Sequence, residues 1–178
     1  EKGPLTAGTR YLCGTSSREN ANPLKGPGNL EVPVAFGAFS RNLGPQGTDF
    51  GYFGGGHPST VSTVDRIDYS NDTATAATKG PLSVARYELS ATGNASFGYF
   101  GGGHPGPKST VDRIDYSNDT ADASPKGPLS AVNRKAGATG NASFGYFGGG
   151  SPGHSSKVDR IDYTNDTATA VEKGPLSS

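Results

Sequence analysis

The chain repeats itself at an interval of 47 residues. The segment Gly-Tyr-Phe-Gly-Gly-Gly begins at Gly51 and returns at Gly98 and Gly145. Three other segments keep the same register: Val-Asp-Arg-Ile-Asp-Tyr begins at Val64, Val111 and Val158, Asn-Asp-Thr at Asn71, Asn118 and Asn165, and Lys-Gly-Pro-Leu at Lys79, Lys126 and Lys173. Because four segments share one interval over three copies, the chain is built from a repeated structural unit.

Each repeat has the pattern of short strands joined by turns. Residues 97–100 combine glycine with aromatic side chains, which favour a half-buried pleated strand. The glycines that follow permit positive φ and the close approach of another backbone. In the next segment, Arg66 and Asp68 fall on one face of a strand because side chains alternate, and we expect a local ion pair between them that bridges to a neighbouring strand. No apolar pattern has the 3.6-residue period of a helix, so we expect almost no helix.

The second half of each repeat predicts a turn and a further strand. Residues 70–73 form the turn, since Asn and Asp bind their own backbone and tolerate left-handed geometry. Residues 73–76 begin a fourth strand, which ends at Gly80 and Pro81. A period of this length with strand-like segments predicts the blades of a β-propeller.

The expected fold is therefore all-β, with four-stranded antiparallel sheets stacked side by side as about three regular blades and one degenerate blade. Residues 51–97 and 98–144 are blade repeats, and residues 145–178 are a partial one. Residues 1–50 carry weak copies of the same segments with 30 residues out of register. They predict a degenerate first blade or irregular segment.

Composition excludes several classes of function. Lys and Arg together equal Asp and Glu at 16 each, so the chain lacks the basic charge of a nucleic-acid-binding protein. No apolar run is long enough for a membrane span. Apolar residues are only 31%, which predicts a thin core. The single Cys13 excludes an internal disulfide and is expected to be a small buried residue. Since the chain opens at Glu1 without Met, we expect a processed product or a portion of a longer protein.

Two polar groups resemble metal sites, and each has a simpler interpretation. His57 and His104 occupy equivalent positions, but His154 is out of register, so turn residues are expected in preference to a metal site. Asp68 and the following Asn-Asp pair offer oxygen ligands without the length or glycine spacing of a calcium loop. We expect Asx turns, no metal and no cofactor.

Two further sets of residues have a binding or a structural interpretation. A ring of tyrosines at Tyr69, Tyr116 and Tyr163 can stack on sugars or pack between blades, and packing is the favoured interpretation. The N-glycosylation pattern occurs at Asn71, Asn94, Asn118, Asn141 and Asn165. A repeat copies each chance sequon, so glycosylation is kept as an alternative only. No nucleophile has a base at a recognisable spacing, so we expect no enzyme activity.

The order of segments resembles the kelch repeat. The matching features are a glycine doublet after an aromatic strand, a Val-Asp-Arg-Ile-Asp strand, and a later arginine, Arg86. The kelch tryptophan is replaced by Ala74, Ala121 and Ala168. The resemblance implies structural roles for the glycine doublets and the strand charges: Gly54, Gly55, Gly101, Gly102, Gly148, Gly149, Arg66, Asp68, Arg113, Asp115, Arg160 and Asp162.

The amino-acid sequence of the repeat also resembles repeats in virion structural and tail-fibre-like proteins of marine bacteriophages. This resemblance implies a non-enzymatic structural protein, located in a virion or outside the cell, that assembles with copies of itself or with other virion or fibre proteins. The alternative is a module that binds a glycan or host receptor through the loops at residues 57–62, 106–109 and 151–156, whose length and sequence vary between repeats.

Overall fold

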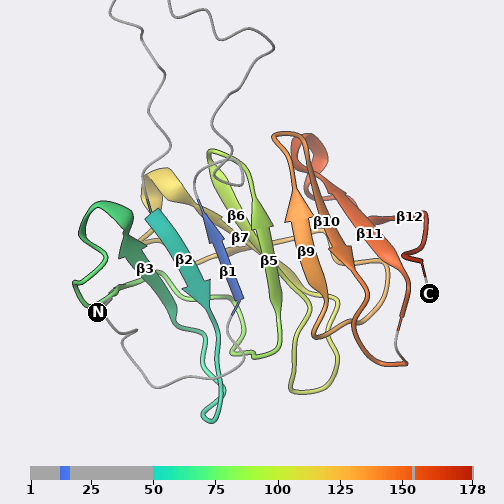
Figure 1. Cartoon of the computed structure of the whole chain (residues 1–178), viewed down its shortest axis with the longest axis horizontal. Coiled ribbons are helices and arrows are strands. Elements are labelled where there is room, and N and C mark those ends of the chain that lie inside the picture. Colours follow the sequence, from blue (N-terminus) through green and yellow to red (C-terminus); the bar gives the residue numbers. More distant parts are fainter. Residues whose placement is uncertain (1–12, 17–49, 154, 178) are drawn as a thin grey trace, which may run out of the picture.

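The computed structural model describes residues 13–16, 50–153 and 155–177. Within them the chain is all-β and forms three antiparallel sheets of four strands each (Figure 1). The only helices in this described part of the chain are three single-turn 3₁₀ segments, at Tyr69–Asn71, Tyr116–Asn118 and Tyr163–Asn165. The strands of the first sheet are β1 (Cys13–Ser16), β2 (Phe50–Gly54), β3 (Val64–Asp68) and β4 (Ala77–Lys79); of the second, β5 (Ser90–Gly93), β6 (Phe97–Gly101), β7 (Val111–Asp115) and β8 (Ser124–Lys126); of the third, β9 (Gly137–Gly140), β10 (Phe144–Gly148), β11 (Val158–Asp162) and β12 (Val171–Lys173). The prediction of an all-β chain with a repeated strand pattern is confirmed.

The three sheets stand side by side in a row. Strand β1 lies against β5, and β5 lies against β9, so the first strands of successive sheets are neighbours (Figure 1). The first and third sheets occupy opposite ends of this row. Each sheet therefore packs its face against the sheet that follows it in the sequence.

The sheets are out of phase with the sequence blocks that begin at Gly51, Gly98 and Gly145. Each sheet starts one strand earlier, at β5 and β9 for the second and third sheets. These first strands are short runs of small residues, with the sequences SATG and GATG, and they carry no strong strand signal. They pair with the aromatic strands because those strands present a free edge.

The expected degenerate first blade falls on residues 1–50, of which the structure describes only Cys13–Ser16 and Phe50. Cys13–Ser16 form the first strand of the first sheet. Cys13 faces Gly54, as Ser90 faces Gly101 in the second sheet. The rest of that predicted segment, and the side chain of Cys13, lie outside the described residues.

The fourth strand begins later than the sequence pattern predicts. Its first residue is Ala77 instead of Thr73. The carboxylate of Asp68 caps the 3₁₀ turn by accepting a hydrogen bond from the Ser70 amide at 2.8 Å. The Ala74 amide then donates to the Asn71 carbonyl at 3.2 Å, which extends the turn by several residues.

The apolar core consists of two small clusters, one at each junction between sheets. The first joins Tyr52 and Leu82 to Phe100 and Tyr116. The second repeats this arrangement 47 residues later with Tyr99, Leu129, Phe147 and Tyr163. The core is thin, as composition predicts, because each sheet buries apolar side chains mainly against its neighbour.

Glycine allows the backbones of adjacent sheets to approach closely at each junction. A Cβ atom added to Gly80 would lie 1.8 Å from the carbonyl oxygen of Ala121, and one added to Gly127 would lie 1.9 Å from that of Ala168. The equivalent Gly174 of the third sheet has no atom within 4 Å of its Cβ position.

We predict that Gly127→Ala lowers the free energy of unfolding by about 3 kcal/mol, because the new methyl group forces the second and third sheets apart. Gly174→Ala is the matched control in the same sequence context, and it should change stability by less than about 0.5 kcal/mol. Urea denaturation followed by circular dichroism measures both. Equal effects of the two substitutions would contradict the close packing at Gly127.

Candidate functional site

The most strongly built polar feature is a junction in which one aspartate binds three side chains of the preceding sheet. Asp119, at the end of the turn after β7, accepts hydrogen bonds from Arg66 Nη1 at 2.7 Å and from the Tyr52 hydroxyl at 3.0 Å. Its other carboxylate oxygen lies 3.2 Å from Lys79 Nζ. The Asp119 side chain is only 9% exposed, so these are charge-assisted contacts shielded from water.

The same junction recurs between the second and third sheets. Asp166 accepts from Arg113 Nη1 at 2.7 Å and from the Tyr99 hydroxyl at 3.0 Å, and Lys126 Nζ lies 3.5 Å from its second oxygen. The Asp166 carbonyl also accepts a hydrogen bond from the Gly127 amide at 2.8 Å. Two equal copies of this geometry make it the defining contact of the repeat, and we refer to each copy as an aspartate junction.

The strand pairing explains why the donors of each junction converge. Tyr52 on β2 faces Arg66 on β3, so the two side chains lie next to each other on one side of the sheet. The guanidinium carbon of Arg66 lies 3.9 Å from the centre of the Phe50 ring, which holds the side chain in position through a cation–π contact. The donors are thus placed by their own sheet before the aspartate arrives from the next one.

The expected local ion pair between Arg66 and Asp68 is wrong. Arg66 binds Asp119, which is 53 residues away in the sequence and belongs to the next sheet. Asp68 instead accepts hydrogen bonds from the amide and the hydroxyl of Ser70 at 2.8 and 2.6 Å. These hydrogen bonds lower the pKa of Asp68, and those from Thr164 do the same for Asp162. The predicted Asx turn at Asp68 is confirmed.

Stacked tyrosines lie beside each aspartate junction. Tyr116 of the second sheet stacks on Tyr52 of the first with ring centres 4.8 Å apart, and Tyr163 stacks on Tyr99 at 4.7 Å. The favoured prediction that these tyrosines pack between sheets is confirmed for both. Tyr69 differs, since 46% of it is exposed.

Burial raises the pKa of the tyrosines at these junctions. For Tyr99 the main cause is burial, and the hydrogen bond to Asp166 adds to it because a negative neighbour disfavours the phenolate. For Tyr163 burial raises the pKa to about 12, against a small opposing effect of its contact with Thr92. Both side chains are therefore held as neutral phenols.

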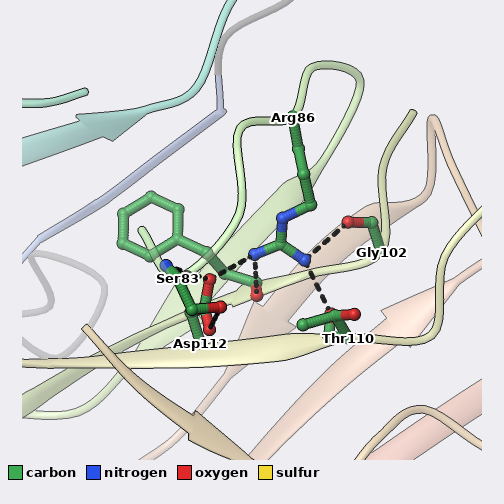
Figure 2. A network of polar contacts seen from close by, with 6 residues as sticks. Ser83, Arg86, Gly102, Thr110 and Asp112 are labelled. Carbon is green, nitrogen blue, oxygen red and sulfur yellow. Dashed lines mark hydrogen bonds and ion pairs between the residues drawn. The ribbon is translucent and has the colours of Figure 1, made fainter. Parts of the chain in front are cut away.

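A second polar network lies deeper in the junction between the first two sheets. Asp112 on β7 accepts hydrogen bonds from the amide and hydroxyl of Ser83 at 3.1 and 2.6 Å and from Arg86 Nη2 at 2.8 Å (Figure 2). Arg86 Nη1 also donates to the carbonyl oxygens of Gly102 and Thr110, each at 3.0 Å. Both charged side chains are fully buried. Arg86, the arginine on which the kelch resemblance rests, thus links the loop after β4 to the second sheet through buried hydrogen bonds.

The glycine doublets have two separate roles. The first glycine leaves space for an aromatic ring of the next sheet: a Cβ atom on Gly54 would lie 2.8 Å from Phe100, and one on Gly101 would lie 2.7 Å from Phe147. The second glycine has a positive φ near 72° in all three copies, which side chains other than glycine rarely adopt. Gly148 meets no such ring, only Leu176 and Val158 at 3.5 Å or more.

The third sheet presents the same donors without an acceptor among the described residues. Arg160, Tyr146 and Lys173 occupy the positions of Arg113, Tyr99 and Lys126, and no described carboxylate lies within salt-bridge distance of Arg160 or Lys173. The nearby Val171 and Leu176 are 52% and 49% exposed. We call this surface, made by Tyr146, Arg160, Lys173 and Gly174, the open face.

Sequence reasoning identified Arg66, Arg113 and Arg160 but missed the acidic partners of the first two. Asp119 and Asp166 were assigned only to a turn, although they recur at the same interval as the arginines. Asp112 was also missed as a binding partner for Arg86. A repeat can pair a residue of one copy with a residue of the next, and that pairing leaves no trace in the local spacing.

The remaining candidate residues lie at the surface or in turns. His57 and His104 both pack against Tyr87, each with its ring centre 4.9 Å from that of the tyrosine, while His154 lies outside the described residues. No group of three or more potential metal-binding side chains occurs in the described part of the chain. No helix among the described residues is long and apolar enough to cross a membrane.

The five sequons occupy two kinds of turn. Asn71, Asn118 and Asn165 end the 3₁₀ turns and are exposed. The Asn94 side chain accepts hydrogen bonds from the amides of Ser96 and Phe97, both at 2.9 Å, and Asn141 repeats this arrangement. Each sequon thus has a structural role in its turn, and glycosylation stays a prediction.

No protein-family model and no curated protein sequence matches the chain. The function is therefore argued below from the repeated junctions themselves.

We predict that Asp166→Asn lowers the free energy of unfolding by about 2 kcal/mol, because Arg113 and Lys126 lose their charged acceptor while the shape of the side chain is kept. Asp122→Asn, at an exposed position, is the control and should have no measurable effect. Thermal and urea denaturation measure both. A loss no larger than that of the control would show that the aspartate junction does not stabilise the fold.

Alkaline pH should destabilise the fold through Tyr163. Its folded pKa of about 12 lies above the ordinary tyrosine value of 10.0, so its contribution to stability is complete below pH 10 and is lost as pH rises towards 12. The free energy of unfolding should fall across this range, and less steeply in Tyr163→Phe. Urea denaturation at several pH values measures the slope. Identical slopes in the two proteins would contradict the raised pKa.

Proposed function

We propose that this chain is a non-enzymatic structural repeat protein that assembles by stacking sheets of its own repeat onto one another, in a virion tail or fibre or in an extracellular filament. The observation that carries the proposal is the open face of the third sheet. It repeats the donors of two aspartate junctions and has no described acceptor.

The two internal junctions indicate what fits the open face. Within the chain, Arg66 and Arg113 each bind the aspartate of an Asn-Asp-Thr turn in the following sheet. Gly80 and Gly127 each lie against the backbone carbonyl of an alanine that follows the same turn. Arg160 and Gly174 offer the same combination, so a sheet carrying this turn is the complementary partner.

The contact is directional, because donors lie on one face of a sheet and the aspartate belongs to the next sheet. A contact between two different faces forms closed rings or open filaments, according to the rotation between units. A kelch-like propeller is the ring form of this arrangement, and propellers have about four to eight blades. A sheet supplied by a second copy or by another virion or fibre protein would either close such a ring or lengthen the row.

The location in a virion or outside the cell is supported by the resemblance of the repeat to bacteriophage tail-fibre-like proteins. The absence of net charge in the sequence agrees with a role that does not involve nucleic acid. Repetition supports a scaffold over an enzyme, since the same side chains recur in every sheet.

The alternative of a glycan- or receptor-binding module also has a structural observation in its favour. The variable loops at residues 57–62, 106–109 and 151–156 each follow the second strand of a sheet. They therefore lie at corresponding ends of three sheets, where loops can share one binding surface.

We predict that the purified chain associates in a concentration-dependent manner and that Arg160→Ala or Gly174→Leu weakens this association without loss of folding. The matched control is Arg113→Ala, which removes an internal junction and should lower the free energy of unfolding by about 2 kcal/mol. Sedimentation velocity and urea denaturation measure the two effects. Assembly through the open face would be contradicted if the chain stayed monomeric at all concentrations, or if both variants left its association unchanged. The loop-based alternative predicts that association does not respond to these variants.

A further inference from the structure

The junction between the first and second sheets contains an arginine that the next junction lacks. Arg86 is fully buried and binds Asp112 together with the carbonyl oxygens of Gly102 and Thr110 (Figure 2). One repeat later the sequence has Asn133 in its place. The two junctions share the contact between an aspartate and a serine, and the backbone hydrogen bonds at this position.

The backbone holds both positions in the same way. The Arg86 amide donates to Val61 and its carbonyl accepts from Gly56, at 3.0 and 2.9 Å. The Asn133 amide donates to Lys108 and its carbonyl accepts from Gly103, at 2.9 and 2.8 Å. A side chain at position 133 therefore starts from the same place and in the same direction as Arg86.

The acid that Arg86 binds is also repeated. Asp159 is only 4% exposed, and it accepts hydrogen bonds from the amide and hydroxyl of Ser130 at 3.0 and 2.6 Å, as Asp112 does from Ser83. No described cation lies within salt-bridge distance of Asp159. A buried carboxylate without a cation is costly, and in the first junction the Arg86 guanidinium group offsets this cost for Asp112.

Asn133 makes only one of the hydrogen bonds that Arg86 makes one repeat earlier. Asn133 Nδ2 donates to the Gly149 carbonyl at 2.9 Å, which corresponds to the contact of Arg86 with Gly102. Its Oδ1 atom is buried and has no hydrogen-bond partner. The neighbouring Arg134 does not compensate, since its guanidinium group binds Glu88 at 2.8 Å in the preceding loop.

A cavity of about 210 Å³ lies between the loop after β8 and the third sheet. Its lining includes Asn133, Ser151, Ser155, Lys157 and Asp159. The Lys157 ammonium group is directed to Glu172, with the two charged atoms 3.1 Å apart. The cavity thus combines a buried carboxylate and an unpaired amide oxygen, both of which accept hydrogen bonds.

We propose that this cavity is a binding site for a guanidinium group, carried either by a small arginine-like molecule or by an arginine side chain of a protein partner. The ligand would occupy the place of the Arg86 guanidinium one repeat later, with Asp159 and Asn133 Oδ1 as its acceptors. A planar group with several N–H donors fits this set better than an ammonium ion, because the acceptors lie in different directions around it. The site does not depend on assembly through the open face.

The test is a titration of the whole chain with ethylguanidinium, followed by ¹H–¹⁵N NMR, with propylammonium as the amine control. The amide signals of Asn133 and Gly149 should shift with ethylguanidinium and not with propylammonium. A short peptide with a central arginine forms a second arm: shifts with both ligands assign the site to an arginine side chain, and shifts with ethylguanidinium alone assign it to a small molecule. No shift with either ligand, or equal shifts with the amine, would overturn the proposal.

Two variants make the test specific. Asp159→Asn should weaken binding by about tenfold or more, because a hydrogen bond to a charged acceptor is lost. Asn133→Arg should rebuild the network of Arg86, raise Tm and abolish binding of ethylguanidinium. Asp122→Asn is the control and should bind as the unaltered chain does. Unchanged binding of ethylguanidinium in Asn133→Arg would contradict the assignment of the cavity. If a variant fails to fold, the titration of the unaltered chain still decides whether the cavity binds a guanidinium group.

Discussion

The aspartate junction is the contact on which the rest of the structure depends. A single sheet of this repeat has little apolar surface, and its strands are three to five residues long. Burial alone gives such a sheet a small driving force, because small units expose most of their surface. The carboxylate of Asp119 or Asp166 adds three directional contacts at each junction, and these fix how far apart and at what angle the sheets lie. Gly80 and Gly127 then permit a close contact between the backbones of adjacent sheets, which any side chain at these positions would prevent.

Much of this architecture can be predicted from the sequence. The aromatic segment and the Val-Asp-Arg-Ile-Asp segment become strands in all three copies, since their side chains favour a pleated surface and the period fixes their order. The role of the second glycine follows from its backbone, because a positive φ is difficult for any other residue. Tyr116 and Tyr163 pack between sheets, as large amphipathic rings in a chain without tryptophan are expected to do.

Other features could not be predicted, for physical reasons. The partner of Arg66 lies in the next repeat, and no local rule distinguishes Asp119 from the closer Asp68. The first strand of each sheet consists of small residues that have no strand preference of their own and are recruited by the edge of an aromatic strand. The cavity at Asn133 lies where two repeats diverge in sequence, since residues 131–137 differ from residues 84–90 at every position. It becomes visible only when the two junctions are compared atom by atom.

The first sheet differs from the others in how its first two strands are joined. Residues 94–96 connect β5 to β6, whereas residues 17–49 separate β1 from β2. The pairing of β1 with β2 therefore joins segments that are far apart in the sequence, whereas β5 and β6 form a local hairpin. Pairings between distant segments form more slowly than local ones, so the first sheet is expected to be the last of the three to complete.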